Sequence, residues 1–442
     1  MKSDISGFPE FLPNEQIAFN KAVDTIRSYF EAYGFIPIDT AAVERIETLL
    51  SKGNDKEIYG LYRISDENSK KELGLRFDLT VPLARYITSN GGQLLYPFKR
   101  YQIAPVWRGE RPQYGRYRQF YQCDIDIIGD EELSIAHDAE IISVVTEILA
   151  ALKIPKCITK INNRKILINF LNRFVPPSRI SEAVVLIDKM EKISPEEFEK
   201  SILELGIEKD SLVPLRKFLS NDHRKENADV LLWLKQLSFG PEFYEGIAEL
   251  EEVLQLLKKM DIDDRQVKIS LNLARGLNYY TGNIFETSLV DYPDMGSISG
   301  GGRYEKLTNM VGSQKQYPGV GATIGISRLF TKLLEKELVK CESTATAEVL
   351  VTVQNRTLLS SYMRLAKDLR KVGIKAETFL QDKGLGAQIS YASRRGFKFV
   401  VIANEVELLE GKAILRNLET KEQKIFDTRY VTRSILVSFE RT

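Results

Sequence analysis

Residues 98–129 read FKRYQIAPVWRGERPQYGRYRQFYQCDIDIIG and predict two strands joined by an irregular loop. The segment between the strands, GERPQYGRY (109–117), contains Gly and Pro residues, which favour a loop over a helix. Successive side chains of a strand point to opposite faces of the sheet. One face of the second strand therefore carries an amide and two carboxylates, in the series Arg118, Phe120, Gln122, Asp124 and Asp126.

This polar face lies beside a loop rich in arginine, with guanidinium groups at 108, 111, 116 and 118. Carboxylates suit a cationic small molecule, and arginine side chains suit a polyphosphate. A solvated hairpin face explains the same spacing equally well. The pattern alone leaves both interpretations open.

Composition limits the class of protein. A chain of 442 residues is long enough for two or three domains. The net charge of +1 means that a nucleic-acid partner would have to meet a local basic patch. The 3 Cys residues are far apart and only 2 His are present, so we expect neither a disulfide framework nor a metal site built from side chains. Without a signal peptide or a long apolar run, the sequence predicts a soluble cytoplasmic protein that does not enter a membrane.

Hydrophobic periodicity predicts the order of the elements. Helices are expected from Asn14 to Gly34 and over 131–152, several more over 171–258, and strands over 75–81 and 267–274. Residues 319–338 predict a strand, a glycine turn and a helix. From about 345 strands and helices alternate, which is typical of an α/β domain with a largely parallel sheet.

Several of these segments also resemble one known family. WRGERPQYGRYRQFYQCDIDIIG (107–129) resembles the second signature motif of class II aminoacyl-tRNA synthetases, and is most similar to that of histidyl-tRNA synthetases. FIPIDTAAVER (35–45) and GVGATIGISRLF (319–330) resemble the first and third class II motifs. RFDLTVPLARY (76–86), RGLNYYTG (275–282) and GGGRYEKL (300–307) are similar to histidyl enzymes, and ISYASRRGFKFVVI (389–402) is similar to an anticodon-binding domain. The chain departs from the usual family residues at Ala41, Asn278 and Ser327.

The resemblance implies an architecture. It predicts an α+β catalytic domain over residues 1–335 on a mainly antiparallel sheet, with a helical insertion at about 171–258. A C-terminal α/β domain of the anticodon-binding type would follow over 345–442. The family also implies a homodimer.

The resemblance further implies a reaction and a site. Histidine would be ligated to its tRNA through a histidyl-adenylate, with ATP as the energy source and Mg²⁺ as the companion ion of ATP. The catalytic cations would be Arg108 and Arg275. ATP would be held by Arg108, Glu110, Arg116, Tyr117, Phe120 and Arg328, and histidine by Asp78, Thr80, Gln122, Asp126, Arg275, Tyr279 and Tyr280.

Two other functions are compatible with parts of the sequence. The first is a catalytically silent paralogue that regulates ATP phosphoribosyltransferase, although such paralogues typically lack the C-terminal domain and lose motif arginines. The second is another class II synthetase, such as a prolyl or threonyl enzyme, which would not account for RGLNYY or YQCDIDI.

Overall fold

The structure is a computed structural model that describes residues 5–50, 62–64, 72–109, 111, 115–190, 193–220, 226–274, 280–305, 308–341 and 344–429. The chain divides into two compact units. The first takes in Met1–Pro9 and Ala22–Leu338, and the second takes in Glu10–Lys21 and Val339–Thr442. Within the described ranges, no helix is both long and apolar enough to cross a membrane.

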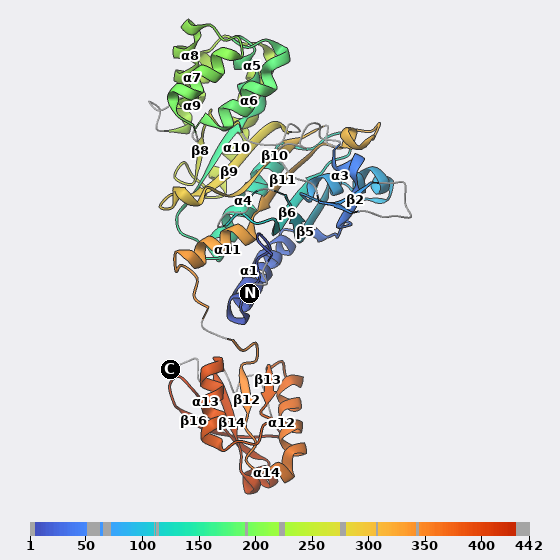
Figure 1. Cartoon of the computed structure of the whole chain (residues 1–442), viewed down its shortest axis with the longest axis vertical. Coiled ribbons are helices and arrows are strands. Elements are labelled where there is room, and N and C mark those ends of the chain that lie inside the picture. The colour runs from blue at the N-terminus through green and yellow to red at the C-terminus, as the bar shows by residue number, and fades with distance from the viewer. Residues whose placement is uncertain are drawn as a thin grey trace. The chain divides into compact units, whose positions relative to one another are not determined.

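The first unit is built on a sheet that has 8 strands in the described ranges, in the order β1-β5-β6-β11-β10-β9-β7-β8 (Figure 1). The pairs β1·β5 and β7·β8, at the two edges, are parallel, and the pairs between them are antiparallel. The predicted mainly antiparallel α+β sheet is therefore confirmed. The strands are β1 (Ile36–Pro37), β5 (Phe98–Trp107), β6 (Gln119–Ile128), β7 (Cys157–Asn163), β8 (Val267–Ile269), β9 (Tyr280–Leu289), β10 (Ser297–Tyr304) and β11 (Gly319–Ile324).

Helices cover this sheet, and a smaller sheet of β2 (Val43–Arg45), β4 (Leu73–Leu75) and β3 (Arg63–Ile64) accompanies it. The helices of the unit outside the insertion are α1 (Pro13–Ala32), α2 (Ile46–Leu49), α3 (Thr80–Asn90), α4 (Ala136–Ala151) and α11 (Ile326–Glu335). The first part of α1 is grouped with the second unit. Buried Arg303 of β10 ties α4 to the sheet, because its guanidinium donates to the Asp138 carboxylate at 2.8 Å.

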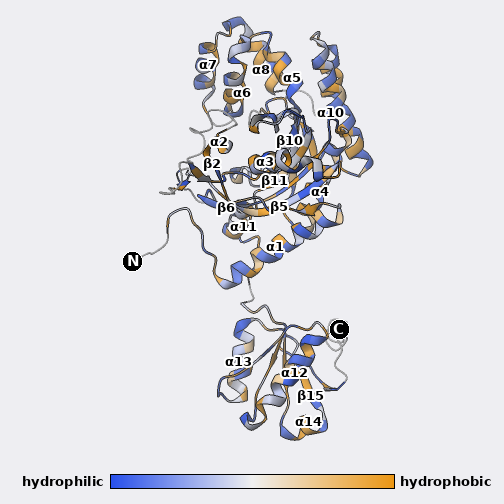
Figure 2. Ribbon diagram, turned by 90° about the vertical axis from the view of Figure 1, so that its right-hand side faces the viewer, coloured by the Kyte–Doolittle hydropathy of each residue, from blue (hydrophilic) through white to orange (hydrophobic). Residues whose placement is uncertain are grey.

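A helical module occupies the region predicted as an insertion. Its helices are α5 (Arg164–Leu171), α6 (Ile180–Asp188), α7 (Pro195–Glu204), α8 (Leu212–Ser220), α9 (Asn227–Gln236) and α10 (Pro241–Lys259). Aromatic rings fill its core, with Phe170 stacked on Phe218 at 3.6 Å between centroids. Hydrophilic and hydrophobic residues both occur along α10 (Figure 2), whose buried residues include Phe243, Ile247, Leu250 and Val253. This spacing is that of an amphipathic helix.

The second unit is an α/β domain, as the sequence predicts. Its sheet has the order β13-β12-β14-β15-β16, in which β13, β12 and β14 are parallel and the last two strands are antiparallel. The strands are β12 (Val349–Val351), β13 (Ala376–Thr378), β14 (Phe399–Ile402), β15 (Lys412–Asn417) and β16 (Gln423–Asp427). The helices are α12 (Leu359–Lys371), α13 (Leu385–Arg395) and α14 (Glu405–Glu410).

Two predicted strands are wrong in extent. The segment 75–81 leaves the strand after Leu75, and α3 begins at Thr80. The Asp78 carboxylate accepts the backbone N–H of Val81 at 3.0 Å, so it satisfies a free donor of the first helical turn. The predicted strand over 267–274 ends at Ile269.

Candidate active site

The hairpin of β5 and β6 sets the polar face of the site. The two strands pair without interruption from Phe98↔Ile128 to Trp107↔Gln119, so Arg100 lies opposite Asp126 and Gln102 lies opposite Asp124. The other neighbour of β6 is β11, which places Thr323 beside Asp124 and Gly321 beside Asp126. These cross-strand pairs bring the acids together with residues remote in sequence.

A small polar pocket opens on this face. Four strands and the start of α3 contribute to it, and its lining consists of Thr80, Asp124, Asp126, Tyr280, Tyr304, Gly321, Ala322 and Thr323. The structure thus brings together three of the residues predicted to bind histidine, namely Thr80, Asp126 and Tyr280. Gln122 joins the group through Thr323, to whose hydroxyl its Nε2 donates at 3.4 Å.

The acids of the pocket are buried and share one buried counterion. Asp126 is 4% exposed and forms an ion pair with Arg100, which is fully buried. Tyr304 donates its hydroxyl to Asp126 Oδ1 at 2.7 Å. Burial raises the pKa of Asp126, while Arg100 and the Tyr304 hydrogen bond oppose that shift. Burial likewise raises the pKa of Asp124 to about 7, with Arg100 opposing the shift and Asp126 adding to it.

Asp78 is a further buried carboxylate whose charge acts on Asp124 and Asp126. It is 4% exposed, and its charge contributes to raising the pKa of both Asp124 and Asp126. Among the described residues, the three carboxylates Asp78, Asp124 and Asp126 therefore outnumber Arg100, the arginine paired with Asp126. A bound cation such as an ammonium group would relieve this imbalance.

Arg108 stands at the end of β5, next to the arginine-rich loop. Its Nε donates to the Phe77 carbonyl at 3.1 Å, and its guanidinium lies 5.0 Å from the centre of the Phe120 ring. The backbone N–H of Arg108 also donates to the Arg118 carbonyl at 2.8 Å. These contacts hold the guanidinium close to the aromatic ring, and both groups are predicted to bind ATP.

Helix α11 contacts β6 and the segment that precedes β6. The Ser327 hydroxyl accepts the backbone N–H of Tyr121 at 2.8 Å, and Tyr117 donates its hydroxyl to Thr331 at 3.2 Å. Ser327, one of the departures from the family pattern, therefore makes a direct contact with β6. Arg328 is half-buried on this helix and reaches toward Gly296.

Glycines allow the strands of the site to pack closely. A Cβ on Gly321 would lie 2.1 Å from Asp126 Oδ1, and one on Gly301 would lie 2.0 Å from the Gly321 carbonyl oxygen. Gly300, Gly301 and Gly302 belong to β10 and form no turn. Their role in this structure is close backbone approach inside the sheet.

The predicted site is only partly covered by the structure. Glu110, Arg275 and Tyr279 lie outside the described residues, as does Asn278. Arg116 is exposed, and neither it nor Arg328 lines the pocket. The sequence-based list omitted Arg100, Asp124, Tyr304 and Thr323. Alternation along β6 places Asp124 on the same face as Asp126, and the hairpin pairing leads from Asp126 to Arg100.

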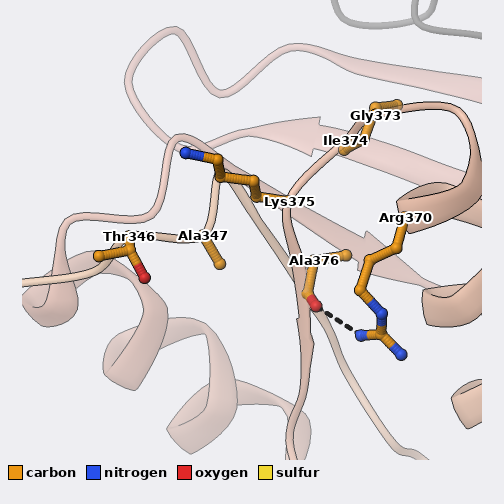
Figure 3. Close-up of a pocket in the computed structure, with 7 residues that line it drawn as sticks. All are labelled: Thr346, Ala347, Arg370, Gly373, Ile374, Lys375 and Ala376. Carbon is orange, nitrogen blue, oxygen red and sulfur yellow. Dashed lines mark hydrogen bonds between the residues drawn. The ribbon is translucent and has the colours of Figure 1, made fainter. Parts of the chain in front are cut away.

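A second hollow lies in the C-terminal unit, lined by Thr346, Ala347, Arg370 and residues 373–376 (Figure 3). The Arg370 guanidinium donates to the Ala376 carbonyl at 2.7 Å, and Lys375 extends in a different direction (Figure 3). Because the two cations do not converge, this hollow does not form an anion site.

Comparison with known proteins identifies a matching family for each of two parts of the chain. Residues 7–329 match the family described as histidyl-tRNA synthetase, and residues 348–435 match the anticodon binding domain. The chain is 40% identical to a histidine–tRNA ligase of Clostridium tetani over 431 residues, which covers 96% of this chain and 97% of the relative. The chain belongs to the histidyl-tRNA synthetase family. The resemblance seen in the sequence motifs is thereby confirmed.

Solved structures agree with this family. The crystal structure of histidyl-tRNA synthetase from Nostoc sp. PCC 7120 is 35% identical, with a TM-score of 0.88 and coverage of 100% of this chain and 99% of that one. A structure titled as an ATP phosphoribosyltransferase regulatory subunit/histidyl-tRNA synthetase from Bacillus halodurans C is 19% identical, has a TM-score of 0.72 and covers 88% of this chain and 96% of that one. That likeness shows the fold alone. The regulatory function is therefore not favoured over that of an aminoacyl-tRNA synthetase.

Proposed function

We propose that this protein ligates histidine to its cognate tRNA, at the expense of ATP, through a histidyl-adenylate. The observation that carries the proposal is the acidic pocket on β6, which joins Thr80, Asp126 and Tyr280 within a chain of the histidyl-tRNA synthetase family. Asp78, Gln122, Arg275 and Tyr279 are proposed to complete the histidine site.

The first step joins two anions. The carboxylate oxygen of histidine attacks the α-phosphorus of ATP, and pyrophosphate leaves. Positive charge fixed near the α-phosphate lowers the barrier, since it stabilises the charge that develops there. We assign this role to Arg108 and Arg275. Arg108 is well suited to it, because the Phe77 carbonyl and the Phe120 ring already orient its guanidinium.

The rest of the nucleotide is assigned to neighbouring residues of the hairpin and α11. Tyr117 and Phe120 are proposed to frame the adenine, while Glu110, Arg116 and Arg328 contact the remainder of ATP. We expect Mg²⁺ to accompany ATP and to be held largely by phosphate oxygens. Within the described ranges, no group of three or more His, Cys, Asp or Glu side chains is placed to hold a metal ion.

In the second step a hydroxyl of the 3′-terminal ribose of the tRNA attacks the carbonyl carbon of the adenylate, and AMP leaves. Both nucleophiles come from the substrates, so no nucleophilic side chain is required. A pocket that hydrogen-bonds histidine leaves its buried polar groups unpaired with a wrong amino acid, which supports strong selectivity without editing.

The assembly and domain roles are also proposals. We propose a catalytic domain over 1–335 with an insertion at about 171–258, and an anticodon-binding domain over 345–442. A homodimer is proposed from membership of the histidyl-tRNA synthetase family. We place the protein in the cytoplasm with its tRNA.

Aminoacylation tests this proposal. Purified protein, ATP, Mg²⁺, labelled histidine and unfractionated tRNA should yield acid-precipitable label that alkaline hydrolysis releases. Labelled proline and threonine serve as controls for other class II specificities. Charging with one of these in place of histidine, or no charging at all, would refute the assignment.

A further inference from the structure

Gln122 carries an unsatisfied acceptor next to the pocket. It is 6% exposed, and within the described part of the chain its Oε1 is buried without a hydrogen-bond partner. A buried polar atom without a partner is energetically unfavourable, because it has lost its hydrogen bonds to water. Such an atom points to a ligand that donates a hydrogen bond to it.

The direction of the Gln122 amide is set by its neighbours. The Thr323 hydroxyl donates to Asp124 Oδ1 at 2.7 Å. An ionised carboxylate only accepts, so the single hydroxyl hydrogen of Thr323 is committed to Asp124. The hydroxyl oxygen can then only accept from Gln122, which must present Nε2 to it, at 3.4 Å. The Gln122 oxygen is left facing away from Thr323.

We propose that Thr323 and Asp124 are positioning residues that hold the Gln122 amide with Oε1 available to an N–H donor of the histidine substrate. This inference rests on the proposed function and deepens it. Neither residue needs to take part in the phosphoryl chemistry. Their contribution is to histidine affinity and to the rejection of amino acids that lack a donor at this point.

The hydrogen bonds that join Asp124, Thr323 and Gln122 should depend on pH. Burial raises the pKa of Asp124 to about 7. Protonated Asp124 can donate to Thr323, which frees the hydroxyl hydrogen to turn toward Gln122 and removes the fixed direction of the amide. In the part of the chain that the structure describes, the charged and titratable groups facing Asp124 are Arg100 and Arg76, Asp126 and Asp78, and the pocket hydroxyls of Tyr280 and Tyr304.

Three substitutions separate a positioning role of Thr323 and Asp124 from a purely structural one. Thr323→Val keeps the shape but removes the hydroxyl, whereas Thr323→Ser keeps the hydroxyl. Asp124→Asn keeps the volume but places N–H donors as well as an acceptor beside Thr323, so the Thr323 hydroxyl hydrogen is no longer committed to this side chain. Thr287→Val is the matched control, because the Thr287 and Thr159 hydroxyls are bonded at 2.8 Å and buried in β9 and β7, outside the pocket.

The experiment measures the Kd of histidine by calorimetry, and KM and kcat in pyrophosphate exchange, from pH 6 to pH 8.5. At high pH, Thr323→Val and Asp124→Asn should raise Kd and KM about 10-fold, the size of one hydrogen bond, with kcat nearly unchanged. Thr323→Ser should match the wild type. The ratio of variant to wild-type KM should fall toward one below pH 7, and titration of free histidine cancels in that ratio.

Equal effects of Thr323→Val and Thr287→Val, or a ratio independent of pH, would overturn the inference. If Thr323→Val does not fold, as judged by tryptophan fluorescence, Asp124→Asn and Thr323→Ser decide the outcome. A wild type that binds histidine without catalysing exchange would refute the proposed function, while the Kd series would still test Gln122. A wild type that neither binds histidine nor catalyses exchange would refute both.

Discussion

Arg108 is the described cation best placed to act on ATP. Replacing it with Ala should lower histidine-dependent pyrophosphate exchange about 10²-fold or more, as expected when a preorganised charge donor is lost. Arg265→Ala is the control, because Arg265 is an exposed arginine paired with Asp263. An Arg108→Ala enzyme as active as Arg265→Ala would remove Arg108 from the mechanism.

Tyr304 adjusts the charge state of Asp126. Its hydrogen bond lowers the pKa of that carboxyl against the effect of burial, so Tyr304→Phe should raise the pKa further. As the pH is lowered, Asp126 of the variant is then protonated at a higher pH than in the wild type. The KM for histidine should therefore increase earlier during this decrease in pH. Tyr101→Phe removes a comparable hydroxyl, bonded to Glu31, from the other face of β5. Identical pH profiles for the two variants would contradict the role of Tyr304.

At the scale of elements, the central strands depend on glycine. A side chain on Gly301 would meet the backbone of β11, which must move, so Gly301→Ala should lower the free energy of unfolding by roughly 1–3 kcal/mol. Gly92→Ala, at an exposed position with open space around the new Cβ, should have little effect. Urea unfolding followed by tryptophan fluorescence distinguishes them. Equal midpoints would show that the sheet tolerates the extra methyl group.

Strands with a regular alternation of side chains could be predicted from the sequence. The residues of the pocket could be predicted only in part. The hairpin and Asp126 follow from the period of two in residues 119–128. The same period predicted a strand over residues 75–81 that the structure does not contain in full. Buried Arg76 instead donates to the Thr40 and Pro105 carbonyls, and Asp78 accepts the Val81 N–H in the first turn of α3. Thr323 reaches the site because β11 pairs with β6, and Tyr304 reaches it because β10 pairs with β11. Spacing along the chain does not show that pairing.

For the whole molecule, ligand binding should stabilise one unit selectively. Both tryptophans of the chain, Trp107 and Trp233, belong to the first unit, as does the pocket. Histidine at 100 times its Kd should stabilise that unit by about 2.7 kcal/mol and raise its urea midpoint, as reported by tryptophan fluorescence. Alanine at the same concentration is the control. An unchanged midpoint with histidine would place its binding site elsewhere.

The most direct test of the account is pyrophosphate–ATP exchange by the whole protein without tRNA, measured with each of the twenty amino acids. This assay isolates amino-acid activation and identifies the substrate at the same time. The account predicts exchange that depends on histidine and on no other amino acid. Exchange driven by a different amino acid, or silence with all twenty, would contradict it.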